Sequence, residues 1–265
     1  MMEKMIFGRY VPANSILHSM DPRSKLLFIF GFICVVFLAD NFITYAILGA
    51  FTLTALIFSN LPIRFIIGGL KPILWLILFT FFLHVFFTKE GGVILDLGFL
   101  KIHEEGLRQG IFISLRFFYL ILITSLLTLT TSPITITDGL ETLLNPLRKV
   151  KFPVHELALM MSISLRFIPT LMEETDKIMK AQIARGAEFS SGPIKERIKA
   201  IIPLLIPLFV SAFKRAEDLA TAMEARGYQG GEGRTKYRLL SWHKKDTGAL
   251  VVLGILTALL LFFRG

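Results

Sequence analysis

Five apolar runs, each close to the length of a membrane-crossing helix, constrain this 265-residue chain more than any other feature. A helix needs about 20 residues, at about 1.5 Å each, to cross about 30 Å of hydrocarbon. With 54% apolar residues and a mean hydropathy of +0.65, a soluble domain would expose too much apolar surface. The sequence therefore predicts an all-α, polytopic membrane protein with about five transmembrane helices, which are Leu26–Ala39, Phe42–Phe58, Pro72–Thr88, Ile111–Thr131 and Gly248–Phe263.

The distribution of basic residues predicts the orientation of these helices. The chain carries 29 Lys and Arg against 20 Asp and Glu, and basic residues near the membrane favour the cytoplasmic side. With the N-terminus inside, 13 lysines and arginines close to the membrane are cytoplasmic and 4 are outside. We therefore expect a multi-pass protein of the cell membrane with a cytoplasmic N-terminus, a cytoplasmic segment 132–246 and an extracellular C-terminus. The lipid bilayer accounts for the positive charge, and no nucleic-acid partner is expected.

The 115-residue segment 132–246 is too long for a connecting loop and too regularly patterned for a disordered one. We expect three parts in the chain. Residues 1–131 would hold the N-terminal segment and four transmembrane helices, residues 132–246 a cytoplasmic domain of long amphipathic helices, and residues 247–265 the last transmembrane helix.

Three helices are expected in the cytoplasmic segment. A short amphipathic helix should end near Asn145-Pro146, and a second should run from about Val154 to Arg185. The sequence Ser191-Gly192-Pro193 predicts the start of the third helix, which should continue to about Arg226. Each long helix has an apolar stripe and an opposite charged face. The charged faces include Glu174 in the second helix and Arg215 in the third. Prolines are expected to bend the two long helices, namely Pro169 in the second and Pro203 and Pro207 in the third.

Both long helices end in the same tripeptide, 41 residues apart, as Ala184-Arg185-Gly186 and Ala225-Arg226-Gly227. A single copy is typical of an ordinary helix C-terminus, where glycine adopts a left-handed conformation and arginine favours the dipole. Two copies in one domain indicate instead two equivalent tips that dock into two equivalent pockets. A partner with twofold pseudo-symmetry fits this pattern, such as a dimer of nucleotide-hydrolysing subunits with acidic grooves.

The chain lacks the motifs of an enzyme. It has no G-x-x-x-x-G-K-[ST] nucleotide loop, no G-x-S-x-G elbow and no second histidine to complete the zinc-type start His155-Glu156. Its single cysteine, Cys34, excludes a disulfide framework and a cysteine-rich metal site. We therefore expect no catalytic residues, no metal and no cofactor. A self-contained secondary transporter or an intramembrane enzyme remains the alternative reading.

The chain resembles the transmembrane T component of energy-coupling factor (ECF) transporters, also called the CbiQ-like family. The resemblance covers essentially the whole length. It rests on Gly8-Arg9-Tyr10-Val11-Pro12 and Asp21-Pro22-Arg23-Ser24-Lys25, on Ser164–Pro169, and on both Ala-Arg-Gly tripeptides. The N-terminal stretch is more similar to the shared, vitamin-type T component than to the version dedicated to metal uptake.

This resemblance implies an energy-transducing subunit of an ATP-driven vitamin or micronutrient importer. Its partners would be two ABC-type ATPases, as a heterodimer, and one or more small membrane S components that bind the substrate. The two tripeptides carry over as the ATPase-binding residues, with Arg185 and Arg226 as anchors. Residues implied to contact the S component, with packing between the long helices as the alternative, are Leu157, Met160, Met161, Leu165, Ile201, Leu204, Leu205 and Leu208. Asp21, Pro22 and Arg23 are expected to form a structural turn before the first span.

Overall fold

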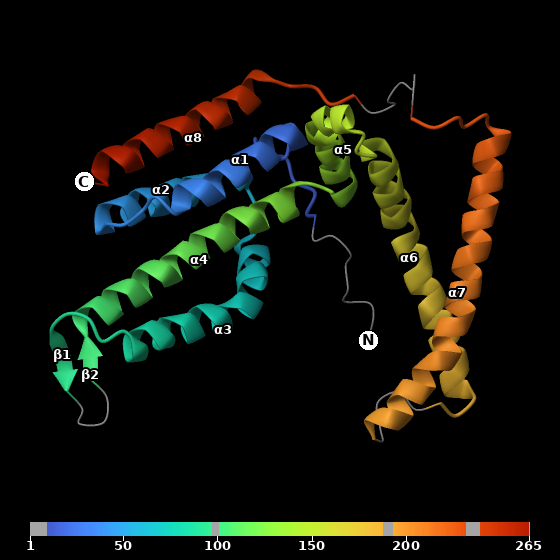
Figure 1. The fold of residues 1–265 in the computed structure, drawn as a ribbon, viewed down its shortest axis with the longest axis horizontal. Coiled ribbons are helices and arrows are strands. Elements are labelled where there is room, and N and C mark those ends of the chain that lie inside the picture. Colours follow the sequence, from blue (N-terminus) through green and yellow to red (C-terminus); the bar gives the residue numbers. More distant parts are fainter. Residues whose placement is uncertain (1–9, 97–100, 188–192, 232–238, 265) are drawn as a thin grey trace. The chain divides into compact units, whose positions relative to one another are not determined.

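In the computed structural model, the described residues are 10–96, 101–187, 193–231 and 239–264, and almost all of them are helical (Figure 1). This confirms the all-α fold. Four residues of the quoted motifs, Gly8, Arg9, Ser191 and Gly192, lie outside the described residues. The chain divides into two compact units. The bundle unit contains the described residues up to Leu143 together with Leu240–Arg264, and the long-helix unit contains the described residues between Leu144 and Leu239.

The bundle unit contains six helices and one small hairpin among its described residues. The hairpin, between α3 and α4, pairs β1 (Val93–Asp96) with β2 (Lys101–His103) in antiparallel fashion, and the sequence did not predict it. The helices are α1 (Pro22–Val36), α2 (Phe42–Ser59), α3 (Ile63–Phe87), α4 (Glu104–Thr130), α5 (Pro133–Leu144) and α8 (Lys244–Phe263).

Five described helices are long and apolar enough to cross a membrane, and four of them are expected spans: α2, α3, α4 and α8. The first expected span forms α1, but its 15 residues make it shorter than these four. The fifth helix of sufficient length and apolarity is α6 (Val154–Ala184), which was expected in the cytoplasmic segment. Helix α6 has 31 residues and an apolar first half. Its length and composition are therefore intermediate between those of an amphipathic helix and those of a membrane-spanning helix.

Four of the spans begin earlier than expected, α1 and α8 by four residues each and α3 and α4 by more. Helix α3 starts at Ile63, so Pro72 lies inside it and not at its start, which neighbouring groups in a membrane helix can accommodate. Helix α4 starts at Glu104 and not at Ile111. Its first turn carries Glu104 and Glu105, and acidic side chains stabilise the positive end of a helix dipole.

The core of the bundle unit lies between α1, α2, α4 and α8. Phe32, Val36, Leu48 and Leu260 are completely buried there, and Phe28, Phe32 and Phe51 stack on one another. Polar contacts mark the two ends of this bundle. At one end, Arg264 pairs with Asp40 at 2.9 Å, while at the other the starts of α1 and α8 meet the end of α4.

The long-helix unit contains a 3-10 turn (η2, Asn145–Val150), α6 and α7 (Ile194–Ala225). Both expected long helices are confirmed to within a residue or two of their ends. The short helix expected to end near Asn145-Pro146 is α5, which ends at Leu144. All three expected prolines lie inside their helices, Pro169 in α6 and Pro203 and Pro207 in α7.

Candidate functional site

The two Ala-Arg-Gly tripeptides form the same helix end twice. Helix α6 stops at Ala184 and α7 at Ala225, and the next residue, Arg185 or Arg226, is the C-cap. The φ and ψ angles are −89° and 6° at Arg185 and −90° and 8° at Arg226. The following glycines, Gly186 and Gly227, have φ values of +87° and +72°. A side chain is disfavoured in that left-handed region, so the glycines fix where each helix ends.

The hydrogen bonds of the two ends also match. In α6 the amide of Gly186 donates to the carbonyl of Ile183 at 2.9 Å, and that of Ala187 donates to Gln182 at 3.0 Å. In α7 the amide of Gly227 donates to Glu224 at 2.8 Å, and that of Tyr228 donates to Met223 at 3.0 Å. Each end is therefore a complete Schellman motif, in which two terminal carbonyls are satisfied by the chain itself.

Both tips are exposed. Ala184, Arg185 and Gly186 are all solvent-accessible, and so are Ala225, Arg226 and Gly227. A Cβ atom added at Gly186 or Gly227 would meet no described atom within 4 Å. The glycines are thus required by backbone conformation and not by close packing within the described chain. Each tip presents an arginine at the end of a closed helix, where its guanidinium can make bidentate hydrogen bonds to a carboxylate.

Helices α6 and α7 pack against each other. Residues of both helices line a groove, and one ion pair joins the two helices. The groove is lined by Ile168 and Leu171 from α6 and by Ala212, Ala216 and Leu219 from α7, among others. Arg215 of α7 forms an ion pair with Glu174 of α6, which also accepts a hydrogen bond from Ser211 at 2.9 Å. The Arg215 guanidinium lies over the Phe167 ring at 5.7 Å. Both charged side chains were expected on solvent-facing surfaces, but they bridge the two helices because each lies next to the apolar stripe.

The residues implied to contact an S component are mostly accessible. Leu157, Met160 and Met161 are exposed on α6, as are Ile201 and Leu205 on α7. Leu165 and Leu208 are half-buried, whereas Leu204 is only 9% exposed. Methionine side chains adapt their shape to different surfaces. The exposed members form apolar surface on both long helices, and the buried Leu204 packs within the chain.

In the bundle unit, Asp21, Pro22 and Arg23 form the turn that starts α1. Asp21 is the N-cap of α1, and its carboxylate accepts from the backbone amide of Arg23 at 2.8 Å. The guanidinium of Arg23 also binds this carboxylate through Nε at 3.0 Å and Nη2 at 2.8 Å. Pro22 occupies the first helical position, where its missing N–H costs nothing. Asp21, Pro22 and Arg23 therefore lie together at the capped start of α1.

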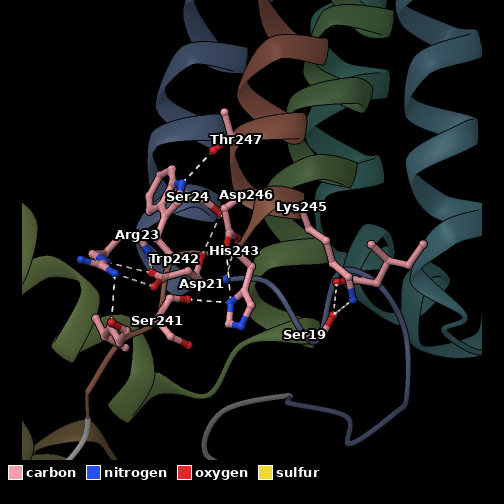
Figure 2. A network of polar contacts seen from close by, with 12 residues as sticks. Ser19, Asp21, Arg23, Ser24, Ser241, Trp242, His243, Lys245, Asp246 and Thr247 are labelled. Carbon is pink, nitrogen blue, oxygen red and sulfur yellow. Dashed lines mark hydrogen bonds and ion pairs between the residues drawn. The ribbon is translucent and has the colours of Figure 1, made fainter.

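The turn is also tied to the start of α8 through Asp246, a residue that the sequence analysis did not single out. Its buried carboxylate accepts from the amide of Asp21 at 2.8 Å, from the hydroxyl of Ser24 at 2.7 Å and from the amide of His243 at 2.7 Å (Figure 2). The signal for this contact is weak in sequence. It consists of one acidic residue three positions after His243, at the start of the last apolar run.

Two pKa values are shifted just before the expected first span, which begins at Leu26. The Asp21 carboxylate raises the pKa of the Arg23 guanidinium above its ordinary value. Burial lowers the pKa of the Lys25 ammonium to about 8, against its usual 10.5. Lys25 donates to the carbonyl of Thr130 at 3.2 Å and to the hydroxyl of Thr131 at 2.9 Å. Through these contacts the start of α1 is fixed to the end of α4.

Comparison with known proteins places these features in a family. The profile of the family described as CbiQ, cobalt transport protein, matches residues 13–237. The energy-coupling factor transporter transmembrane protein EcfT of Bacillus subtilis is 68% identical over 264 residues, which cover the whole of both chains. The chain belongs to the CbiQ-like family of ECF transporter transmembrane proteins. Among other relatives of this family, the EcfT proteins of Listeria innocua and Macrococcus caseolyticus are 61% and 54% identical, again over the full length of both chains.

The family match agrees with the resemblance in the sequence and with the apolar helices. The chain is thus the membrane component of a transporter, and its CbiQ-like match extends over both long helices and both tripeptide ends. No group of three or more histidine, cysteine, aspartate or glutamate side chains that could hold a metal ion occurs in the part of the chain that the structure describes.

Proposed function

We propose that this chain is the energy-transducing scaffold of an ATP-driven importer of a vitamin or another micronutrient. In this proposal two ABC-type ATPases, as a heterodimer, hydrolyse ATP, and a small membrane S component binds the substrate. The chain itself catalyses no reaction and passes movement from one partner to the other. The observation that carries the proposal is the pair of exposed helix ends at Arg185 and Arg226, which share one backbone geometry.

Two identical helix ends favour two equivalent receptors. A dimer of homologous ATPases presents the same kind of groove twice, related by a pseudo-twofold axis. An acidic groove would bind each arginine by charge-assisted hydrogen bonds, which are about twice as strong as neutral ones. The residues before the two arginines, Ala184 and Ala225, have only a methyl side chain. The helix ends can therefore approach a groove closely. Each tip is closed by its own hydrogen bonds, which gives it a defined shape before docking.

The exposed apolar residues of α6 and α7 support the proposal that the chain binds an S component. Leu157, Met160 and Met161 on α6, with Ile201 and Leu205 on α7, offer apolar contact surface. A methionine-containing surface suits partners of differing shape. We propose that this surface binds one or more S components, and that the transported compound is bound by the S component and not by this chain.

The orientation of the proposed subunit follows from its charges. With the N-terminus and residues 132–246 in the cytoplasm, the basic residues near the membrane lie mainly inside. The tips are then on the side where ATP is available, and the C-terminus is extracellular.

The proposal is tested by affinity purification of the tagged chain from its native membrane in mild detergent. Mass spectrometry of the copurifying proteins and an ATPase assay are then made on the same material. The proposal predicts two ABC-type ATPases, at least one small membrane protein, and ATPase activity. Recovery of a stable chain alone, without associated ATPase activity, would contradict it and would favour a self-contained secondary transporter.

A further inference from the structure

Two cavities adjoin each other in the bundle unit, at the end where α1 and α8 begin. The first has a volume of about 400 Å³ and an almost entirely apolar wall that includes Phe28, Phe51 and Leu126. The second has a volume of about 770 Å³ and a wall with polar groups that include Ser15, Ser19 and Asn60. Both volumes fall within the range of about 300–1,000 Å³ typical of ligand sites. Three residues line both cavities, namely Ile16, Phe58 and Lys245.

The charged side chains in the described walls of these cavities are both lysines, Lys25 and Lys245, and no aspartate or glutamate is among those wall residues. The ammonium of Lys25 is buried and already donates to Thr130 and Thr131. Lys245 is exposed, and its Nζ contacts the Ser19 hydroxyl at 3.3 Å. Since an ammonium has three donors, Lys245 retains capacity for an anionic group.

The position of these lysines matches the edge of the hydrocarbon. Lys25 immediately precedes the expected first span, and Lys245 lies three residues before the last one. Phe58 ends the expected second span and Thr130 lies one residue before the end of the fourth, and both line the apolar cavity. All four residues therefore lie at the same membrane surface, where lipid phosphates are found and where basic side chains attract anionic lipids.

We propose that the two cavities form one binding site for an anionic phospholipid, with an acyl chain in the apolar cavity and the phosphate on Lys245. An acyl chain matches the wall formed by α1, α2, α4 and α8, whereas a soluble anion would leave that wall unfilled. The polar cavity provides hydroxyl and amide groups for the head group beyond the phosphate. The bound lipid would connect the segment around Ser15–Ser19 to α2 and α8, because all three line the polar cavity.

The site is tested on the full chain, purified in mild detergent with the subunits that copurify. The protein is incubated with equal amounts of phosphatidylglycerol and phosphatidylcholine of the same acyl chains, and bound lipid is counted by native mass spectrometry. Both lipids carry a phosphate, but the choline cation of phosphatidylcholine offsets its charge, whereas phosphatidylglycerol keeps a net negative charge. A charge-assisted contact with Lys245 therefore predicts a preference for phosphatidylglycerol of about tenfold. Lys245→Gln should remove this preference, whereas Lys244→Gln, at the neighbouring lysine that lines neither cavity, should keep it.

A second pair of variants tests the apolar half of the site independently of charge. Ala55→Phe fills the apolar cavity, and Ala46→Phe adds the same volume at an exposed position of α2. The first should reduce retention of both lipids, and the second should not. Ala249→Phe, which fills the cavity from α8, replaces Ala55→Phe if that variant does not give folded protein. Equal retention of both lipids by the unchanged chain, or equal effects of Lys245→Gln and Lys244→Gln, would overturn the proposal.

Discussion

Arg185 and Arg226 occupy the same structural position in two different helices. Each is the C-cap of a long amphipathic helix, each is exposed, and each is followed by a glycine with positive φ. Their backbone angles differ by only 1–2°. The sequence repeat of 41 residues thus corresponds to a repeated three-dimensional element. This equivalence is the physical basis for proposing two equivalent docking sites on a partner.

Replacing the terminal glycines should open the tips. In Gly186→Ala or Gly227→Ala a side chain must enter the left-handed region, which costs about 1–2 kcal/mol per residue. The two hydrogen bonds that close each helix should weaken, so the amides of Gly186 and Ala187, or of Gly227 and Tyr228, should exchange faster with deuterium. Gly186→Asn and Gly227→Asn are the matched controls, because asparagine tolerates this conformation better. Unchanged exchange in the alanine variants would show that the helix ends do not depend on glycine.

Asp246→Ala should destabilise the bundle unit strongly. The substitution leaves the amides of Asp21 and His243 without their side-chain acceptor, and the hydroxyl of Ser24 keeps only the carbonyl of Asp21. A buried unsatisfied group costs about 1–3 kcal/mol, so a clear fall in the thermal unfolding midpoint in detergent is expected. The control is Asp40→Ala, which breaks the exposed pair with Arg264 and should cost about 1 kcal/mol or less. A similar shift in the unfolding midpoint of both variants would contradict the claim that the hydrogen bonds of Asp246 stabilise the bundle unit.

The contact between Glu174 and Arg215 should stabilise the packing of α6 on α7. A double-mutant cycle with Glu174→Ala and Arg215→Ala, read as unfolding free energy, should give a coupling of about 1 kcal/mol. Both side chains are partly exposed, at 28% each, so screening by solvent limits this value. The comparison is the exposed pair Asp176 and Lys180 on α6, 3.7 Å apart, for which we expect about 0.3–0.5 kcal/mol. No coupling between Glu174 and Arg215 would contradict a stabilising contact.

Lys25 should make stability depend on pH. Its pKa of about 8 in the folded chain lies below the ordinary 10.5, so between these values the unfolded chain binds more protons. The unfolding free energy should therefore rise as the pH increases from 8 to 10.5, and the penalty of burying the charge is full below pH 8. Lys25→Met lacks this group. The stability of the unchanged chain relative to Lys25→Met should increase across the window, and a constant difference would contradict the lowered pKa.

Much of the fold could be predicted from the sequence because its signals are local. Apolar length gives the spanning helices, and the glycines after Arg185 and Arg226 give the ends of α6 and α7. The early start of α4 at Glu104 was missed because its first turns are polar, and apolar length was the criterion. The hairpin of β1 and β2 was missed because two strands of four and three residues have no distinctive pattern.

The contacts between distant segments could not be predicted in the same way. The turn at Asp21 has a clear helix-start sequence, but its partner Asp246 lies 225 positions away. Likewise Glu174 and Arg215 are typical solvent-facing residues by pattern, and only the crossing of α6 and α7 brings them together. Periodicity defines the face of a helix on which a residue lies. It does not define which residue of another helix it meets.

The measurement that tests the central claim most directly is substrate uptake by cells that carry Arg185→Glu and Arg226→Glu, singly and together, with the amount of ATPase that copurifies. Loss of a charge-assisted contact should weaken ATPase binding about tenfold for each arginine. The double variant should bind less ATPase and take up less substrate than either single variant. The matched control, Lys177→Glu with Lys214→Glu, makes the same charge change at exposed positions away from the tips. Full uptake and normal ATPase recovery in the double arginine variant would contradict the account.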